Sequence, residues 1–463
     1  CPFTCTFCDW GSATNAKVSR FELDRLEAEF KWIAKNKIEF VFICDANFGL
    51  LPRDIEIAKM IVKEVKNEGF PKRISTQGAK NVTDRSYEVQ KILMEASVGN
   101  GAALSMQSLD ANVLEAIRRD NISLESYYEL QNRYRAAGIP TYVDLILGLP
   151  EETLETFKSG ITKLIENGAH EHIQFNNLTL LPNAEMNKHR DLYELDVITA
   201  PVWALHAESK LQEDFVREKQ DLVIGSKSMP RNDWREARVF AWFVSLIHLN
   251  KIAQPLILLA HHLSGKSYRD LIEGLMKKNE VGVVANVIQK LHTFAAVIQD
   301  TGQEYFSKEE YLGINWTADE YIFIELVVEN QLKEFIQEIE AKLKSISYEN
   351  NIDDLPYNLV EAAFSECLTL STEQLILPSE LEDRHLTSRT NLVEVIESEK
   401  QSIKSCLKWN SGKFSILKTN DKSLLGLSNE EWMRRVVWYR NKRGAYTWEL
   451  SANSLGIPEG HFR

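Results

Sequence analysis

Five short apolar runs in the first 200 residues have the length and the β-branched content of buried strands. The clearest is Thr141–Leu147 (T-Y-V-D-L-I-L), and Glu39–Cys44 (E-F-V-F-I-C) is similar. Runs that are apolar on both faces are typical of parallel strands covered by helices. The predicted strands are Glu39–Cys44, Arg73–Gly78, Gly101–Ser108, Thr141–Leu147 and His172–Leu180.

Amphipathic segments separate these runs. In Phe21–Lys37, apolar residues recur at or near helical spacing, for example Leu23, Leu26 and Phe30, which indicates a helix with one buried face. The strict alternation of strands and helices predicts an α/β fold with βαβ units around a parallel sheet. The predicted helices are Phe21–Lys37, Asp54–Asn67, Asp84–Ala96, Asp110–Arg119, Leu124–Ala137 and Glu151–Asn167.

The pattern changes after about Ala200. Glycine becomes rarer, long amphipathic runs dominate, and strands are hard to recognise. The clearest helices are Gln331–Ile346, Leu359–Leu370 and Leu392–Leu407. We therefore predict two regions: an α/β domain over residues 1–195, and a mostly helical C-terminal region over residues 196–463 that covers the mouth of the first domain.

Composition narrows the function classes. The chain has 463 residues and a formal net charge of -13, which argues against a nucleic-acid partner, because phosphate binding needs an electropositive face. The most apolar stretch, Val239–Leu263, is interrupted by polar residues and predicts buried helices rather than a membrane span. The sequence shows no signal or transit segment, and we expect a cytoplasmic protein.

Three cysteines at the start of the chain carry the strongest chemical signal. Cys1, Cys5 and Cys8 are spaced C-x3-C-x2-C, with Phe7 before the third. Thiolates this close together can converge on one metal centre and leave one position open. A structural zinc site would need a fourth ligand nearby, but the first histidine is His170. Six cysteines in the whole chain are too sparse for a disulfide framework.

This octet resembles the signature of the radical S-adenosylmethionine (SAM) enzymes. The resemblance implies that Cys1, Cys5 and Cys8 hold a [4Fe-4S] cluster whose fourth iron is chelated by SAM. The reduced cluster would then cleave SAM to a 5′-deoxyadenosyl radical. It also implies a partial (βα)6 TIM-like barrel whose first strand precedes Cys1, and a reductant such as flavodoxin or ferredoxin.

A segment after the first predicted strand lies where this family contacts the SAM amino group. Asp45 and Asn47 follow the Glu39–Cys44 run, at the position of a motif that binds the SAM amino group. Either side chain can accept from an ammonium, although the usual Gly-Gly-Glu form is absent. Ordinary capping of a strand-to-helix turn explains these two residues equally well.

The stretch Ser105-Met106-Gln107-Ser108 and its following helix resemble radical SAM enzymes related to oxygen-independent coproporphyrinogen oxidase. That resemblance puts Gln107 near the SAM ribose and Arg119 opposite the SAM carboxylate, which a guanidinium can bind bidentately. The alternative for Arg119 is a solvated helix end beside Arg118, where a cation is favourable in any case.

The strand that ends in Gly148-Leu149-Pro150-Glu151-Glu152-Thr153 resembles a third motif of the same group, with Glu151 in place of a glycine. Asp144 lies inside this strand, and an acid among apolar residues needs a partner. The partner is either a ribose hydroxyl or nitrogen of SAM, or an ion pair with Arg119.

Asp9-Trp10-Gly11 resembles radical SAM proteins that carry an N-terminal cobalamin-binding domain, which would lie upstream of Cys1. We therefore expect a small-molecule or natural-product substrate and cobalamin-assisted methyl transfer. Hydrogen-atom abstraction without cobalamin is the alternative. An iron–sulfur electron carrier would explain the cysteines but not the SAM motifs. No individual catalytic side chain stands out.

Overall fold

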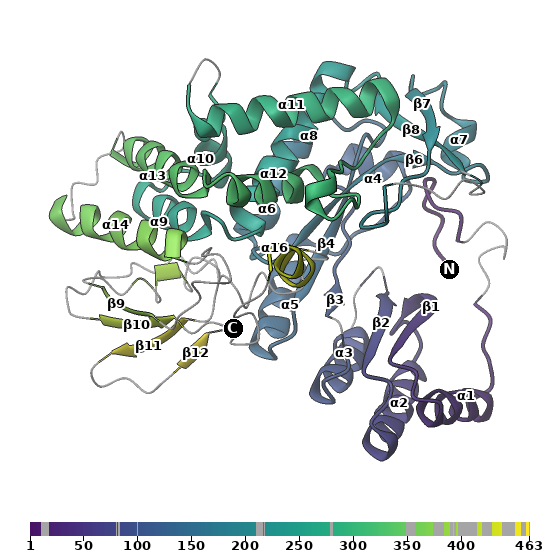
Figure 1. Cartoon of the computed structure of the whole chain (residues 1–463). Coiled ribbons are helices and arrows are strands. Elements are labelled where there is room, and N and C mark those ends of the chain that lie inside the picture. The colour runs from purple at the N-terminus through teal and green to yellow at the C-terminus, as the bar shows by residue number, and fades with distance from the viewer. Residues whose placement is uncertain are drawn as a thin grey trace. The chain divides into compact units, whose positions relative to one another are not determined.

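The computed structural model describes most of the chain as two compact units. The first comprises Cys1–Gly160, Asn167–Val197 and Asp221–Pro230, and the second Ile161–Glu166, Ile198–Gln220 and Arg231–Arg463. Figure 1 labels the helices and strands of the chain. The predicted division between residues 195 and 196 stays a prediction. The described residues are 1–10, 18–79, 81, 84–99, 101–209, 216, 218–277, 281–348, 357–373, 384–388, 392, 395–396, 414–418, 428–437, 450–454 and 460–462.

The first unit contains the predicted parallel strands. β1 (Phe40–Phe48) and β2 (Arg73–Gly78) pair in parallel. A second sheet has the order β3-β4-β5 and is also parallel, with bounds Ala102–Ala103, Thr141–Leu147 and Ile173–Asn177. Helices alternate with these strands, so the predicted α/β class is confirmed.

The helices of the first unit begin and end within a few residues of the predicted bounds. They are α1 (Leu23–Lys35), α2 (Asp54–Glu68), α3 (Asp84–Glu95), α4 (Ala111–Ala116), α5 (Leu124–Ala136) and α6 (Leu154–Glu166), followed by the short α7 (Glu185–Lys188). An apolar core that includes Ile57, Ile61, Ile74 and Leu93 joins α2 and α3 to one face of β1 and β2. This core forms because each helix has an apolar stripe that must be covered.

Strand β4 has one buried face and one partly accessible face. Its buried residues are the odd-numbered ones from Thr141 to Leu147, whereas Tyr142, Asp144 and Ile146 are half-buried. Side chains alternate across a strand, so these three residues share a face. In β5, Asn176 lies opposite Ile146 in the register. This face positions the candidate site.

Two predicted strands were wrong in their extent. Gly101–Ser108 contains only the two-residue β3, and beyond it Gln107 forms an isolated parallel bridge to Leu145 of β4. His172–Leu180 is divided into β5 and the short β6 (Thr179–Leu180), which pairs antiparallel with β8 (Lys219–Gly225). β1 extends past its predicted end to Phe48, and a register irregularity between Ile43 and Phe48 accommodates the extra residues.

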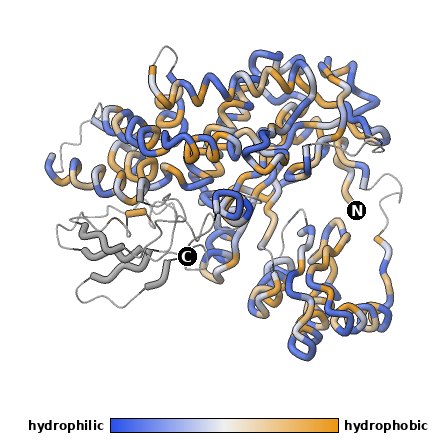
Figure 2. The backbone as a smooth tube through the Cα atoms, viewed as in Figure 1, coloured by the Kyte–Doolittle hydropathy of each residue, from blue (hydrophilic) through white to orange (hydrophobic). Residues whose placement is uncertain are grey.

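The second unit is rich in helices, as predicted. Figure 2 shows hydrophobic and hydrophilic residues alternating along them, as in amphipathic helices. A buried pair, His206 Nε2 and Glu320 Oε2 at 2.8 Å, lies inside this unit. The longer helices are α8 (Arg231–Val244), α9 (Gln254–Ser264), α10 (Tyr268–Leu275), α11 (Val283–Thr301), α12 (Ala318–Val328), α13 (Leu332–Tyr348) and α14 (Tyr357–Glu373).

The second unit also contains a sheet that we did not predict. Four short strands form an antiparallel sheet in the order β12-β11-β10-β9, with bounds Gly460–Phe462, Leu450–Ser454, Phe414–Lys418 and Arg384–Ser388. The predicted helices Gln331–Ile346 and Leu359–Leu370 correspond to α13 and α14. Most of the predicted helix Leu392–Leu407 lies outside the described residues.

Among the described residues, no single helix has both the length and the apolarity to cross a membrane. One pair of helices is long and apolar enough only when its two members are taken together. It consists of α8 with the π-helix Ser245–Leu249, and α9, and it is bent by 96°.

Candidate cofactor-binding site

A pocket of about 380 Å³ lies at the carboxyl ends of the parallel strands of the first unit. Ligands bind at these ends in parallel α/β folds. Most lining side chains can donate or accept hydrogen bonds, and a few are apolar. They are Phe7, Gln77, Gln107, Tyr142, Asp144, Ile146, Asn176, Asn177, Leu178, Thr179 and Leu181.

Asp144 is the acidic residue of this pocket. Its carboxylate accepts hydrogen bonds from the Ser105 hydroxyl and from Asn176. Burial raises its pKa, while these two hydrogen bonds and the charge of Arg119 oppose the rise. Asp144 therefore has partners on β5 and in the segment after β3, and still lines the pocket.

Gln107 lies at a sharp turn four residues after β3. Its φ is +66°, and the Ser108 N–H donates to the Met106 carbonyl at 2.8 Å, which closes a γ-turn of the rare positive-φ kind. The Gln107 N–H donates to the Asp144 carbonyl and its carbonyl accepts from Ile146. Its Oε1 is buried without a hydrogen-bond partner, and is therefore available to a ligand.

Arg119 is buried, so the solvated-helix explanation for it is wrong. It follows α4, donates through Nε to Asn121 and through Nη2 to the Ser105 carbonyl, and hydrogen-bonds the Cys5 side chain. Burial lowers its pKa, and the nearby Cys5, Asp144 and Cys8 oppose this. The structure thus brings Arg119 together with Asp144 and the cysteine loop.

The cysteine loop is anchored next to the pocket. The Thr6 N–H donates to Ile117 and the Thr6 carbonyl accepts from Met186, while Phe7 packs against an apolar core that includes Ile117. Cys5 is buried, and Cys1 and Cys8 are half-buried. In the described part of the chain, no three Cys, His, Asp or Glu side chains are gathered closely enough to hold a metal ion.

The cysteine loop nevertheless fits an iron–sulfur cluster by its donor set. It places three thiols within one eight-residue loop, and thiolates are the usual cluster ligands. The Cys8 N–H bonds to the Cys5 carbonyl at 3.2 Å and folds the loop back. The assignment of the three cysteines stays a prediction.

Asp45 and Asn47 do not line the pocket. Both lie in the irregular last part of β1, not after it as predicted. The exposed Asp45 accepts from the Asn47 N–H at 3.0 Å. Asn47 is buried, and its Oδ1 has no hydrogen-bond partner. Of the two, Asn47 has the free acceptor, while Asp45 shapes the turn.

The turn that follows Asn47 is fixed by Asp54 and by Gly49. Asp54, the first residue of α2, accepts the N–H groups of Gly49 and Leu51, each at 2.9 Å. Gly49 has φ +96°, and a Cβ there would lie 2.9 Å from the Ser86 Cα. Only glycine fits this close approach without displacement.

Sequence reasoning missed several polar residues of this region, among them Ser105, Tyr142, Asn176 and Asn121. Tyr142 could have been found because it lies two residues before Asp144 and so on the same face of β4. Asn176 could have been found because it pairs in β5 with Ile146 of that face. Burial and the charge of Asp144 raise the pKa of Tyr142 to about 12, so its hydroxyl stays a hydrogen-bond donor at neutral pH. Nothing in the local sequence indicates Asn121.

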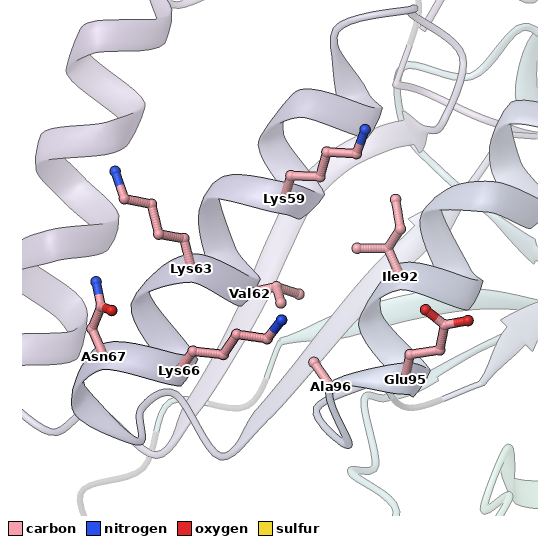
Figure 3. A pocket seen from close by; sticks show the side chains of 8 residues that line it. All are labelled: Lys59, Val62, Lys63, Lys66, Asn67, Ile92, Glu95 and Ala96. Carbon is pink, nitrogen blue, oxygen red and sulfur yellow. The ribbon is translucent and has the colours of Figure 1, made fainter.

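A second hollow, of about 460 Å³, lies between α2 and α3. Figure 3 shows Lys59 and Lys66 of α2 beside Ile92 and Glu95 of α3. Lys63, which also lines it, contacts Glu27 at 3.2 Å. It is lined by none of the residues of the strand-end pocket.

Comparison with known proteins agrees with the geometry. The family model of the Radical SAM superfamily matches residues 1–163. These residues form a radical SAM domain. The motif-based recognition is confirmed.

Two curated relatives are similar over more than half of this chain. One is the cobalamin-dependent radical SAM methyltransferase TokK from Streptomyces tokunonensis, 40% identical over 59% of this chain and 40% of the relative. The other is the 2-(S-pantetheinyl)-carbapenam-3-carboxylate methyltransferase of Streptantibioticus cattleyicolor, 42% identical over 54% of this chain and 36% of the relative. This chain therefore spans about two fifths of their length.

Among solved structures, the radical SAM methyltransferase TsrM from Kitasatospora setae is similar at 15% identity and a TM-score of 0.41. The match covers 65% of this chain and 60% of TsrM.

Proposed function

We propose that this chain is the catalytic part of a radical SAM enzyme, with SAM bound in the strand-end pocket. The observation that carries the proposal is the junction of the cysteine loop with that pocket. Phe7 lines the pocket, and Arg119 lies beside both Cys5 and Asp144. Cys1, Cys5 and Cys8 would hold a [4Fe-4S] cluster, which when bound and reduced supplies the electron that cleaves SAM.

The chain's own residues would bind and orient SAM. Gln107 Oε1, which lines the pocket, and Asn47 Oδ1, which lies outside its lining, are buried acceptors without partners, suited to a hydroxyl and an ammonium. The Arg119 guanidinium would pair with the SAM carboxylate. Asp144 would accept from a ribose hydroxyl, and Tyr142 would donate to the ligand.

We further propose that the whole protein transfers a methyl group to a small molecule with the help of cobalamin. Two observations support this: both curated relatives are named methyltransferases, and the name of one includes cobalamin. The described part of the Asp9-Trp10-Gly11 motif ends at Trp10. We expect a flavodoxin or ferredoxin as reductant and the cytoplasm as compartment.

The cluster is tested by Cys5→Ala, with Cys44→Ala as the matched control because Cys44 is exposed on β1. After anaerobic reconstitution with iron and sulfide, we expect about four irons per chain in the unsubstituted protein and the control. Cys5→Ala should lose the brown colour and most of the iron. Stoichiometric zinc in a colourless anaerobic protein would contradict the proposal.

The reaction is tested with SAM, dithionite and hydroxocobalamin on a protein that includes the proposed cobalamin-binding domain. A carbapenam thioether is the first substrate to try, because the name of one relative includes such a compound. A methylated product that depends on cobalamin is the expected result. Deoxyadenosine formation without bound corrinoid or methylated product would favour simple hydrogen abstraction.

A further inference from the structure

Asn121 joins two of the predicted SAM contacts through one side-chain amide. It lies in the connection between α4 and α5, two residues after Arg119. Its Nδ2 donates to the Met106 carbonyl at 2.8 Å and to the Ser108 carbonyl at 2.9 Å. Its Oδ1 accepts from Arg119 Nε at 2.8 Å.

The two carbonyls that Asn121 binds are those on either side of Gln107. The turn between them has a positive φ at a non-glycine residue, a conformation that persists only when the surrounding structure holds it. The Met106 carbonyl also accepts from the Ser108 N–H and so closes the turn. Asn121 therefore holds the turn that directs the free Gln107 Oε1.

The same amide fixes the plane of the Arg119 guanidinium. Nε is bound by Asn121 and Nη2 by the Ser105 carbonyl. Nη1 is buried and makes no conventional hydrogen bond to nitrogen or oxygen, while the guanidinium hydrogen-bonds the Cys5 side chain. A fixed plane matters because a guanidinium binds a carboxylate through a rigid fork.

We infer that Asn121 is a positioning residue that sets Gln107 and Arg119 together for SAM, an inference that rests on the proposed function. Only a primary amide offers two donors and one acceptor in a single plane at this length. Aspartate has the same shape, but it would put a carboxylate against two carbonyls. Alanine would leave both carbonyls and the Arg119 Nε without this partner.

The test compares Asn121→Ala and Asn121→Asp with the matched control Asn132→Ala. Asn132 lies on α5 and also accepts from an arginine, Arg135, at 3.2 Å. SAM affinity is measured on cluster-loaded protein with iron content and melting temperature recorded. Both Asn121 variants should bind SAM roughly tenfold more weakly or worse, with the control and the iron content unchanged. Unchanged SAM affinity in both variants overturns the inference.

Two readouts separate positioning from a general loss of structure. In a double-mutant cycle with Arg119→Ala, the loss of affinity should be well below the sum of the single losses, because Asn121 acts through Arg119. Full additivity overturns the inference.

Amide exchange at Ser108 should rise in Asn121→Ala but not in the control, and this is measurable without SAM. If the unsubstituted protein binds no SAM, the proposed function fails, while Ser108 exchange still decides whether Asn121 holds the turn.

Discussion

At the scale of single residues, the backbone conformation of Glu151 shows that replacing the family's glycine costs stability. Glu151 has φ +63° and is exposed, directly after the Gly148-Leu149-Pro150 turn. The left-handed conformation is unfavourable for residues with a Cβ and easy for glycine. The family's glycine at this position therefore has a conformational reason.

We predict that Glu151→Gly stabilises the protein by up to about 1 kcal/mol, because the relieved backbone strain exceeds the added entropy of the unfolded chain. Chemical denaturation measures the change. Glu155→Gly on the first turn of α6 is the control and should destabilise, since glycine disfavours helix. A Glu151→Gly variant less stable than the parent would show that the side chain makes a contact outweighing the strain.

At the scale of elements, β1 is the most unusual strand. In the described part of the chain it pairs only with β2, and its Phe40 and Phe42 are 53% and 42% exposed. These alternate residues lie on the face opposite the core that includes Ile57 and Ile61. An edge strand with exposed aromatic residues favours association with another chain or segment.

We predict that Phe40→Lys together with Phe42→Thr reduces self-association of this chain, because a charge on an edge strand opposes strand pairing. Light scattering over a concentration series gives the measurement. Lys35→Thr, on the neighbouring α1, serves as a control and should leave association unchanged. Equal association of the double variant and the parent would mean that another surface is responsible.

At the scale of the whole molecule, one buried acid links separate parts of the first unit and makes stability depend on pH. Glu152 Oε1 accepts from the Ser108 hydroxyl at 3.0 Å, which joins the segment between β3 and α4 to the turn before α6. Burial, aided by the charge of Asp110, raises the pKa of Glu152 to about 8. Hydrogen bonds from Ser108 and Thr156 oppose this rise.

The folded protein therefore keeps a proton on Glu152 that the unfolded chain releases near its ordinary pKa of 4.5. Between pH 4.5 and about 8 the folded state binds more protons, so this group lowers stability as pH rises, by at most about 1.4 kcal/mol per pH unit. We predict that Glu152→Gln raises the melting temperature at pH 8 but hardly at pH 5. A difference between variant and parent that is constant across this range would exclude the raised pKa.

The sequence by itself determined the α/β class, most helix and strand positions in the first unit, and the cysteine motif. These follow from local regularities: the period of apolar residues selects helix or strand, and the spacing of Cys1, Cys5 and Cys8 along one loop needs no tertiary partner. The sequence also pointed to Gln107, near the end of a predicted strand where such folds bind ligands, and to Asp144, an acid inside an apolar strand that needs a partner.

Tertiary structure alone decided the environment of each polar group. The burial of Arg119, the turn at Gln107 and the three hydrogen bonds of Asn121 depend on how α4, β3 and β4 pack, and local sequence does not encode that packing. The four-stranded sheet of the second unit was missed because its strands are short and far apart in sequence, from β9 to β12. Pairing between distant segments, not local periodicity, stabilises such a sheet.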